Sequence, residues 1–129
     1  MEAQPIGARF PWTLRLHLKR DFERAFEGGR KTVRSDAILW AVERSDAGPP
    51  RMGIVTSRRL GPAVTRNRLK RLIRESFRRG RPSLKTGFDF VVYLRPGRCC
   101  WKNLEEANRS LLGLWKKAGL LVDTSAHRR

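Results

Sequence analysis

The sequence predicts a single folded domain that combines helices with strands. Three stretches carry apolar residues at helical spacing, and three others carry the alternating or continuous apolar runs that are typical of strands. The chain has 129 residues, of which 40% are hydrophobic. That content suits one domain with a modest core and is well above what a disordered chain carries.

The N-terminal part predicts a loose arm followed by a short helix. Residues 1–11 contain several prolines and a glycine, which disfavour regular structure. A helix is predicted over residues 19–27, before a pair of glycines that would end it. Its apolar stripe has a four-residue spacing and consists of Leu18, Phe22 and Phe26. On the residues alone, such a stripe is more often core than ligand-binding.

Three strands are predicted from the remaining apolar runs. The first covers residues 31–44 and is apolar on both sides at its centre, so we expect both faces to be covered or nearly so. A glycine–proline loop leads to a second strand over residues 52–57, and we expect these two strands to pair as an antiparallel hairpin. Residues 88–94 are the most strand-like run in the chain.

The segment from residue 66 to residue 79 is the most unusual part of the chain. Read as a helix, it has an apolar face made of Leu69, Leu72, Ile73 and Phe77. The opposite arc is polar and cationic and consists of Asn67, Lys70, Arg71, Arg74 and Arg78. Arg66 lies at the border of this arc, and Arg68 lies on the other side of the helix.

Only Glu75 offsets these cations, and like charges close together on a helix repel. The whole chain has 29 Lys and Arg against 12 Asp and Glu, a formal charge of +17. A polyanion is therefore the simplest partner to expect.

A last helix is predicted to begin at a capping box and to end at Gly119. Asn103 can accept a hydrogen bond from the free amides, and Glu106 stands three residues further on. The apolar stripe that follows is Ala107, Leu111, Leu114, Trp115 and Ala118.

No catalytic constellation and no metal site is predicted. His17 and His127 are far apart, the carboxylates are scattered, and no Cys/His spacing suits zinc. No apolar run reaches the ~18 residues of a membrane span. Cys99 and Cys100 are adjacent, which is poor geometry for a disulfide. We therefore expect a reduced, cytoplasmic protein.

Residues 65–78 resemble the signature known as the RNR motif of the bacterial ribonuclease P protein component. They read Thr-Arg-Asn-Arg-Leu-Lys-Arg-Leu-Ile-Arg-Glu-Ser-Phe-Arg. Three other stretches match the family in order and spacing, at residues 21–29, 53–61 and 89–92. The resemblance covers residues 14–118 and is specific because the whole ordered set is present.

This resemblance implies a particular α+β fold: a two-layer α/β sandwich of the ribosomal S5 domain 2-like type, with a mixed sheet and a left-handed β-α-β crossover. Such a crossover departs from the right-handed rule and could not be inferred from the residues themselves. Residues 1–129 would form one domain with an ordered core at 14–118. Flexible tails are expected at 1–11 and 121–129.

The function implied is that of the RNA-binding protein subunit of ribonuclease P. It would assist the RNA subunit in removing the 5′ leader of precursor tRNA, by binding the leader and by promoting metal and substrate affinity. The catalytic centre and its Mg²⁺ would be held mainly by the RNA, so the protein alone is expected to be inactive and to bind no metal tightly. The expected partners are the RNA subunit and the leader, with no membrane.

Two surfaces follow from the resemblance. The RNA-binding surface would consist of Arg58, Arg59, Arg66, Asn67, Arg68, Lys70, Arg71, Arg74 and Arg78. The leader cleft would contain Phe22, Phe26, Trp40 and Thr56. The three aromatic rings suit leaders of varied sequence, because bases stack on such rings without regard to sequence. Arg58-Arg59 and Trp40 depart slightly from the family, which more often has lysines and a smaller aromatic there.

Two other functions remain as alternatives. A non-catalytic RNA-binding protein of ribosomal type fits the charge, but the ordered motifs argue against it. A DNA-binding module would place the basic helix in a major groove, where only Asn67 suits readout of adenine.

Overall fold

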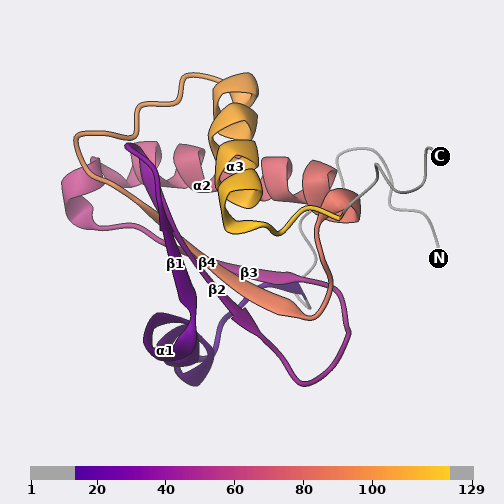
Figure 1. The fold of residues 1–129 in the computed structure, drawn as a ribbon. Coiled ribbons are helices and arrows are strands. Elements are labelled where there is room, and N and C mark those ends of the chain that lie inside the picture. The colour runs from indigo at the N-terminus through magenta and orange to yellow at the C-terminus, as the bar shows by residue number, and fades with distance from the viewer. Residues whose placement is uncertain (1–13, 123–129) are drawn as a thin grey trace, which may run out of the picture.

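The computed structural model describes residues 14–122 and shows three helices and one sheet (Figure 1). Short 3₁₀ turns lie at Arg58–Leu60 and Arg81–Ser83. The helices and strands are α1 (Lys19–Gly28), β1 (Arg30–Val33), β2 (Ala37–Glu43), β3 (Arg51–Val55), α2 (Ala63–Gly80), β4 (Phe88–Leu94) and α3 (Leu104–Ala118). In Figure 1, α2 and α3 lie on one face of the sheet and α1 lies on the other.

The four-stranded sheet is mixed and has the order β1-β2-β4-β3. β2 runs antiparallel to both β1 and β4, whereas β3 runs parallel to β4. This arrangement confirms the α+β class and the mixed sheet. The helix α2 joins the two parallel strands, and the handedness of that crossover stays a prediction.

The predicted strand over residues 31–44 is wrong as a single element, because it is two strands joined by a tight turn. The amide of Arg34 donates to the carbonyl of Ala37 over 2.8 Å and closes the turn. Arg34, Ser35 and Asp36 form a polar interruption of the kind that favours turns. The chain therefore contains an antiparallel β1–β2 hairpin that the prediction missed.

The predicted hairpin between the strands at 31–44 and 52–57 is also wrong. β4 lies between β2 and β3, with Leu39 and Ile54 both opposite Val92. Five of the seven β4 residues are buried, so this strand belongs at the centre, where both faces are covered. The long connection after β2 allows β3 to take the far edge.

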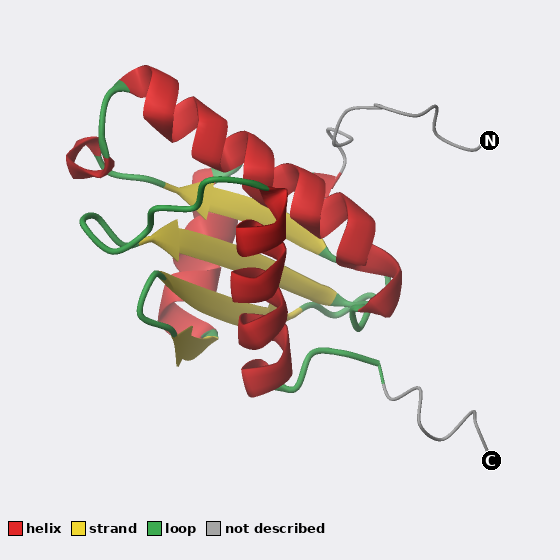
Figure 2. Ribbon diagram, turned by 90° about the horizontal axis from the view of Figure 1, so that it is seen from above, coloured by secondary structure: helices red, strands yellow, loops and turns green. Residues whose placement is uncertain are grey.

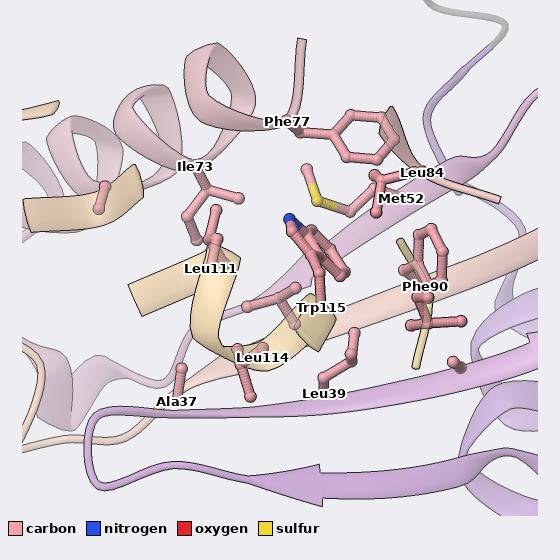
Figure 3. Close-up of a cluster of buried hydrophobic side chains, with 14 of the residues drawn as sticks. Ala37, Leu39, Met52, Ile73, Phe77, Leu84, Phe90, Leu111, Leu114 and Trp115 are labelled. Carbon is pink, nitrogen blue, oxygen red and sulfur yellow. The ribbon is translucent and has the colours of Figure 1, made fainter. Parts of the chain in front are cut away.

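The main core lies between the sheet and the two helices α2 and α3, which cross over the sheet in Figure 2. Phe77 of α2, Phe90 of β4 and Trp115 of α3 are buried there, and the rings of Phe90 and Trp115 are 5.0 Å apart (Figure 3). The predicted stripe of α3 is wholly buried. On α2, Leu72 is only half-buried, and Ser76 is buried in addition to the predicted residues.

A smaller cluster lies under α1, on the other face of the sheet. It is built on Leu16, Ala25 and Val91, with Phe22 and Trp40 among the half-buried residues packed against it. Alternate residues of β2 therefore enter different clusters, and the prediction of a strand covered on both faces, or nearly so, is confirmed.

The helix ends follow from local chemistry. Pro62 is the N-cap of α2, where the sequence predicted Gly61, and Gly80 is the last residue of that helix. At α3, Asn103 accepts a hydrogen bond from the amide of Glu106 over 3.0 Å, as the capping box predicts. Gly119 ends the helix with φ 72°, a left-handed conformation that favours glycine.

The predicted tails fall almost wholly outside the described residues. Of them only Leu121 and Val122 are described: Leu121 forms a β-bridge with Leu84, and the amide of Val122 donates to the carbonyl of Ser83 over 2.8 Å. Within residues 14–122, no helix is long and apolar enough to cross a membrane.

Candidate nucleic-acid interface

The N-terminal two thirds of α2 carry cations that no described carboxylate neutralises. Asn67, Arg68 and Arg71 are exposed, whereas Lys70 and Arg74 are half-buried. The one acid of the helix, Glu75, is engaged further along by Arg78 over 2.6 Å and by Arg79 over 2.8 Å. The hydrogen bond from Arg78 lowers the pKa of Glu75. The positive charge is therefore concentrated before Glu75.

Two of the predicted arginines are held by backbone carbonyls. Arg66 donates to the carbonyl of Gly61 over 3.1 Å, and Arg68 donates to that of Trp101 over 3.0 Å. A guanidinium has five N–H donors in a fixed plane, so one such bond orients the group and leaves other donors for a ligand. These contacts therefore preorganise the cations as well as support the fold.

A small cavity of about 90 Å³ connects the aromatic and cationic parts of the predicted site. Phe22 of α1 lines it together with Lys70 and Arg74 of α2, and the floor is provided by β3. The described residues around it include no acid. Burial lowers the pKa of Arg74, and the positive charge of Arg15 adds to the effect. The cavity therefore favours an anion.

Phe22 reaches this position because β3 carries a glycine beneath it. A Cβ atom at Gly53 would lie 2.5 Å from two atoms of the Phe22 ring, closer than any real contact. The ring therefore lies directly over the backbone of β3. The available signal in the sequence was a glycine inside a strand, which often marks such a close approach.

Phe26 and Trp40 form the outer part of the aromatic surface. Their ring centroids are 4.8 Å apart at an interplanar angle of 89°, an edge-to-face contact. The ammonium of Lys31 lies 5.7 Å from the centre of the Trp40 ring. Phe26 is 42% exposed, so much of its ring faces solvent. The structure therefore brings Phe22, Phe26 and Trp40 into one layer between α1 and the sheet.

The other predicted residues lie where β3 leaves the sheet. Thr56 is half-buried and directly follows β3, and Arg58 and Arg59 are exposed in the 3₁₀ turn that leads to α2. They continue the cationic surface from α2 towards the end of β3.

Sequence reasoning missed a cluster of arginines that are bound by a carboxylate inside the fold. Asp89 of β4 is fully buried and accepts hydrogen bonds from Arg24, Arg44 and Arg51. Burial pushes the pKa of Asp89 upwards, but hydrogen bonds from Arg51 and Arg44 outweigh it and leave the pKa below its ordinary value. A lone aspartate within an apolar strand was the available signal.

The mixed α+β fold, the cationic α2 and the adjacent aromatic layer define an RNA-binding protein. The ribonuclease P family model matches residues 10–119, and the chain belongs to this family. It therefore has the role of the protein component of ribonuclease P, a ribonucleoprotein that processes tRNA. The alternative of a ribosomal-type protein finds no support in the relatives.

Two curated relatives illustrate the match. The ribonuclease P protein component of Dictyoglomus turgidum is 37% identical over 114 residues, covering 87% of this chain and 94% of the relative. That of Brevibacillus brevis is 33% identical over 113 residues, covering 88% of this chain and 89% of the relative.

Solved structures agree with these relatives. The RNase P protein of Staphylococcus aureus has a TM-score of 0.77 at 26% identity and covers 84% of this chain and 98% of that one. The RNase P protein of Thermotoga maritima has a TM-score of 0.69 at 33% identity and covers 80% of this chain and 96% of that one.

Proposed function

We propose that this chain binds the RNA subunit of ribonuclease P through α2 and the 5′ leader of precursor tRNA through the aromatic layer beside α1. The observation that carries the proposal is the cavity in which Phe22 of α1 meets Lys70 and Arg74 of α2 with no acid among the described lining residues. Cations neutralise phosphates, and aromatic rings stack on bases of any sequence. Single-stranded RNA of varied sequence requires both.

The catalytic centre and its Mg²⁺ belong to the RNA subunit in this proposal. Metal-assisted attack on a phosphodiester needs well-placed cations more than protein side chains. Three acids among the described residues have other partners: Asp89 and Glu75 bind arginines, and Asp36 accepts a hydrogen bond from Trp101. Among residues 14–122, no group of three or more His, Cys, Asp or Glu side chains could hold a metal.

The protein then contributes charge and surface. A basic protein lowers the repulsion between two RNAs that must approach each other, which raises the affinity of the holoenzyme for substrate and for divalent metal. This role is exercised in the cytoplasm, the compartment predicted from the unpaired cysteines.

The test compares two leader lengths in the reconstituted holoenzyme. Phe26→Ala removes an exposed ring, so it should weaken binding of precursor tRNA with a leader of several nucleotides by about 1–3 kcal/mol if one base stacks there. A substrate with a one-nucleotide leader should be unaffected. Leu112→Ala, which removes an apolar side chain of similar exposure (44%) from α3, should affect neither substrate.

Two results would contradict the proposal. Equal losses for both leader lengths, together with a lower melting temperature, would show that Phe26 supports the fold and does not bind RNA. Magnesium-dependent cleavage by the protein freed of RNA would show that the catalytic centre is not in the RNA. Phe22→Ala and Trp40→Ala are less clean, because these residues are half-buried and their loss also costs stability.

A further inference from the structure

Arg24 is the arginine of the Asp89 cluster that the carboxylate needs least. Arg51 binds Asp89 with two hydrogen bonds, of 2.9 and 2.8 Å, and Arg44 adds a third of 3.0 Å. Arg24 makes a single hydrogen bond of 3.0 Å to an oxygen that already accepts from Arg51. The side chain of Arg24 is 44% exposed, whereas that of Arg44 is 8% exposed.

The pKa of Asp89 supports this difference. The pKa lies below its ordinary value because hydrogen bonds from Arg51 and Arg44 outweigh the effect of burial. The carboxylate would therefore stay ionised if Arg24 were absent. The hydrogen bond of Arg24 therefore matters for the position of α1 and not for the charge of Asp89.

α1 has few other polar attachments. It has no side-chain N-cap, its one fully buried residue is Ala25, and the ion pair between Lys19 and Glu23 is exposed and internal to the helix. Arg24–Asp89 is the ion pair that joins this helix to the sheet among the described residues.

The position of Arg24 on the helix determines what the bond constrains. At about 100° per residue, Arg24 and Phe26 lie about 200° apart, on opposite flanks of α1. One flank is fixed to β4 through Asp89, and the other rests on β2 through the contact between Phe26 and Trp40. Two attachments on opposite flanks prevent the helix from rolling on the sheet.

We propose that Arg24 is a positioning residue: its hydrogen bond to Asp89 sets the roll of α1 and so places the rings of Phe22 and Phe26 for the leader. The second clause rests on the proposed function, whereas the first concerns the fold alone. Arg24 itself would not contact RNA.

The experiment compares Arg24→Gln with Arg20→Gln. Arg20 is exposed on the same helix and has no ion pair with a described residue, so both variants lose the same charge from α1. NMR of the free protein would follow the indole signals of Trp40, which the ring of Phe26 shifts. We expect these signals to move in Arg24→Gln and to stay in Arg20→Gln.

The reconstituted holoenzyme provides the second measurement. Arg24→Gln should lose about three- to fivefold in affinity for a long-leader substrate, the size expected for a partly exposed ion pair, and keep its affinity for a one-nucleotide leader. Arg24→Lys, which keeps a donor and the charge, should restore both the affinity and the Trp40 signals.

Each outcome separates the two claims. Unchanged Trp40 signals in Arg24→Gln, or equal affinity losses in the Arg24 and Arg20 variants, would overturn the positioning role. Shifted signals with unchanged long-leader affinity would leave the roll of α1 established and would overturn the proposed binding of leader to these rings.

Discussion

Arginines in two regions of this molecule differ in whether a carboxylate binds them. Around Asp89, Arg44 and Arg51 are both bound by one fully buried carboxylate. On α2, Arg68 and Arg71 are exposed and have no ion pair with a described residue. The residue type is the same, and only the access to a carboxylate differs.

This difference shows why net charge alone does not locate a binding surface. A formal charge of +17 indicates a polyanionic partner but not which cations face it. Some arginines are bound by a carboxylate inside the fold, whereas the cations of α2 can bind an external anion. The predictions below test this division, beginning with the largest expected effect.

Removal of the carboxylate of Asp89 should destabilise the fold strongly. Asp89→Asn leaves Arg44 and Arg51 without their buried partner, and breaking a buried ion pair from one side costs about 3–5 kcal/mol. Urea unfolding would measure the loss. Asp46→Asn removes the exposed carboxylate that also binds Arg44, and it should have a much smaller effect.

The same carboxylate predicts a pH dependence. The folded pKa of Asp89 is below its ordinary value, so its stabilising contribution is complete above the ordinary value of 3.8 and is lost as the pH falls through the lower folded pKa. The acid limb of the stability profile should therefore be shallower in Asp89→Asn. An unchanged limb would show that Asp89 does not titrate with unfolding.

Cations of α2 should act on RNA and only weakly on the fold. Replacing Arg66, Arg68 and Lys70 with alanine should weaken binding to the RNA subunit and flatten its salt dependence by about 0.9 in slope per lost phosphate contact on a duplex-like site. Filter binding over a range of salt concentrations would measure both.

A charge-matched control uses cations from outside α2. Lys102, Arg109 and Lys116 are exposed on or just before α3, and their replacement removes the same charge. The control should leave the slope nearly unchanged. If affinity falls in the α2 variant while the slope stays the same, these side chains support the fold, as the bonds of Arg66 and Arg68 to backbone carbonyls would then explain.

The sequence predicted local elements well and long-range partners poorly. α2, β4 and α3 follow from periodicity and caps, because these signals lie within a few residues of each other. The place of β4 between β2 and β3 depends on residues about 50 positions apart, such as Leu39 and Val92, and no local pattern contains it. The antiparallel hairpin was therefore assigned to the wrong pair of strands.

The candidate site shows the same limit. The cationic arc of α2 could be predicted because it is one helix face. The cavity shared by Phe22 and Arg74 requires contacts between distant segments, and so does the binding of Arg24, Arg44 and Arg51 by Asp89. Burial decides the role of these side chains, and burial is a property of the assembled fold.

The smallest predicted effect is that of replacing Glu75. α2 carries both kinds of arginine, those that Glu75 binds and those that have no ion pair with a described residue. Glu75 neutralises Arg78 and Arg79 in half-exposed pairs, and such pairs contribute about 0.2–1 kcal/mol. Glu75→Gln should therefore cost little stability. The pKa of Glu75 is lowered by Arg78, so this contribution is present above the ordinary value of 4.5 and is lost at more acidic pH.

The same substitution should improve RNA binding, because it frees two cations and removes the one negative charge of α2. Glu105→Gln is the control: it removes the same charge from α3 and breaks a longer and more exposed i,i+4 pair with Arg109, at 3.6 Å. Both variants should lose little stability in a thermal melt, but only Glu75→Gln should bind the RNA subunit more tightly and with a steeper salt dependence. Weaker binding by Glu75→Gln would mean that Glu75 holds Arg78 in the orientation that RNA requires, and the last turn of α2 would then belong to the RNA-binding surface.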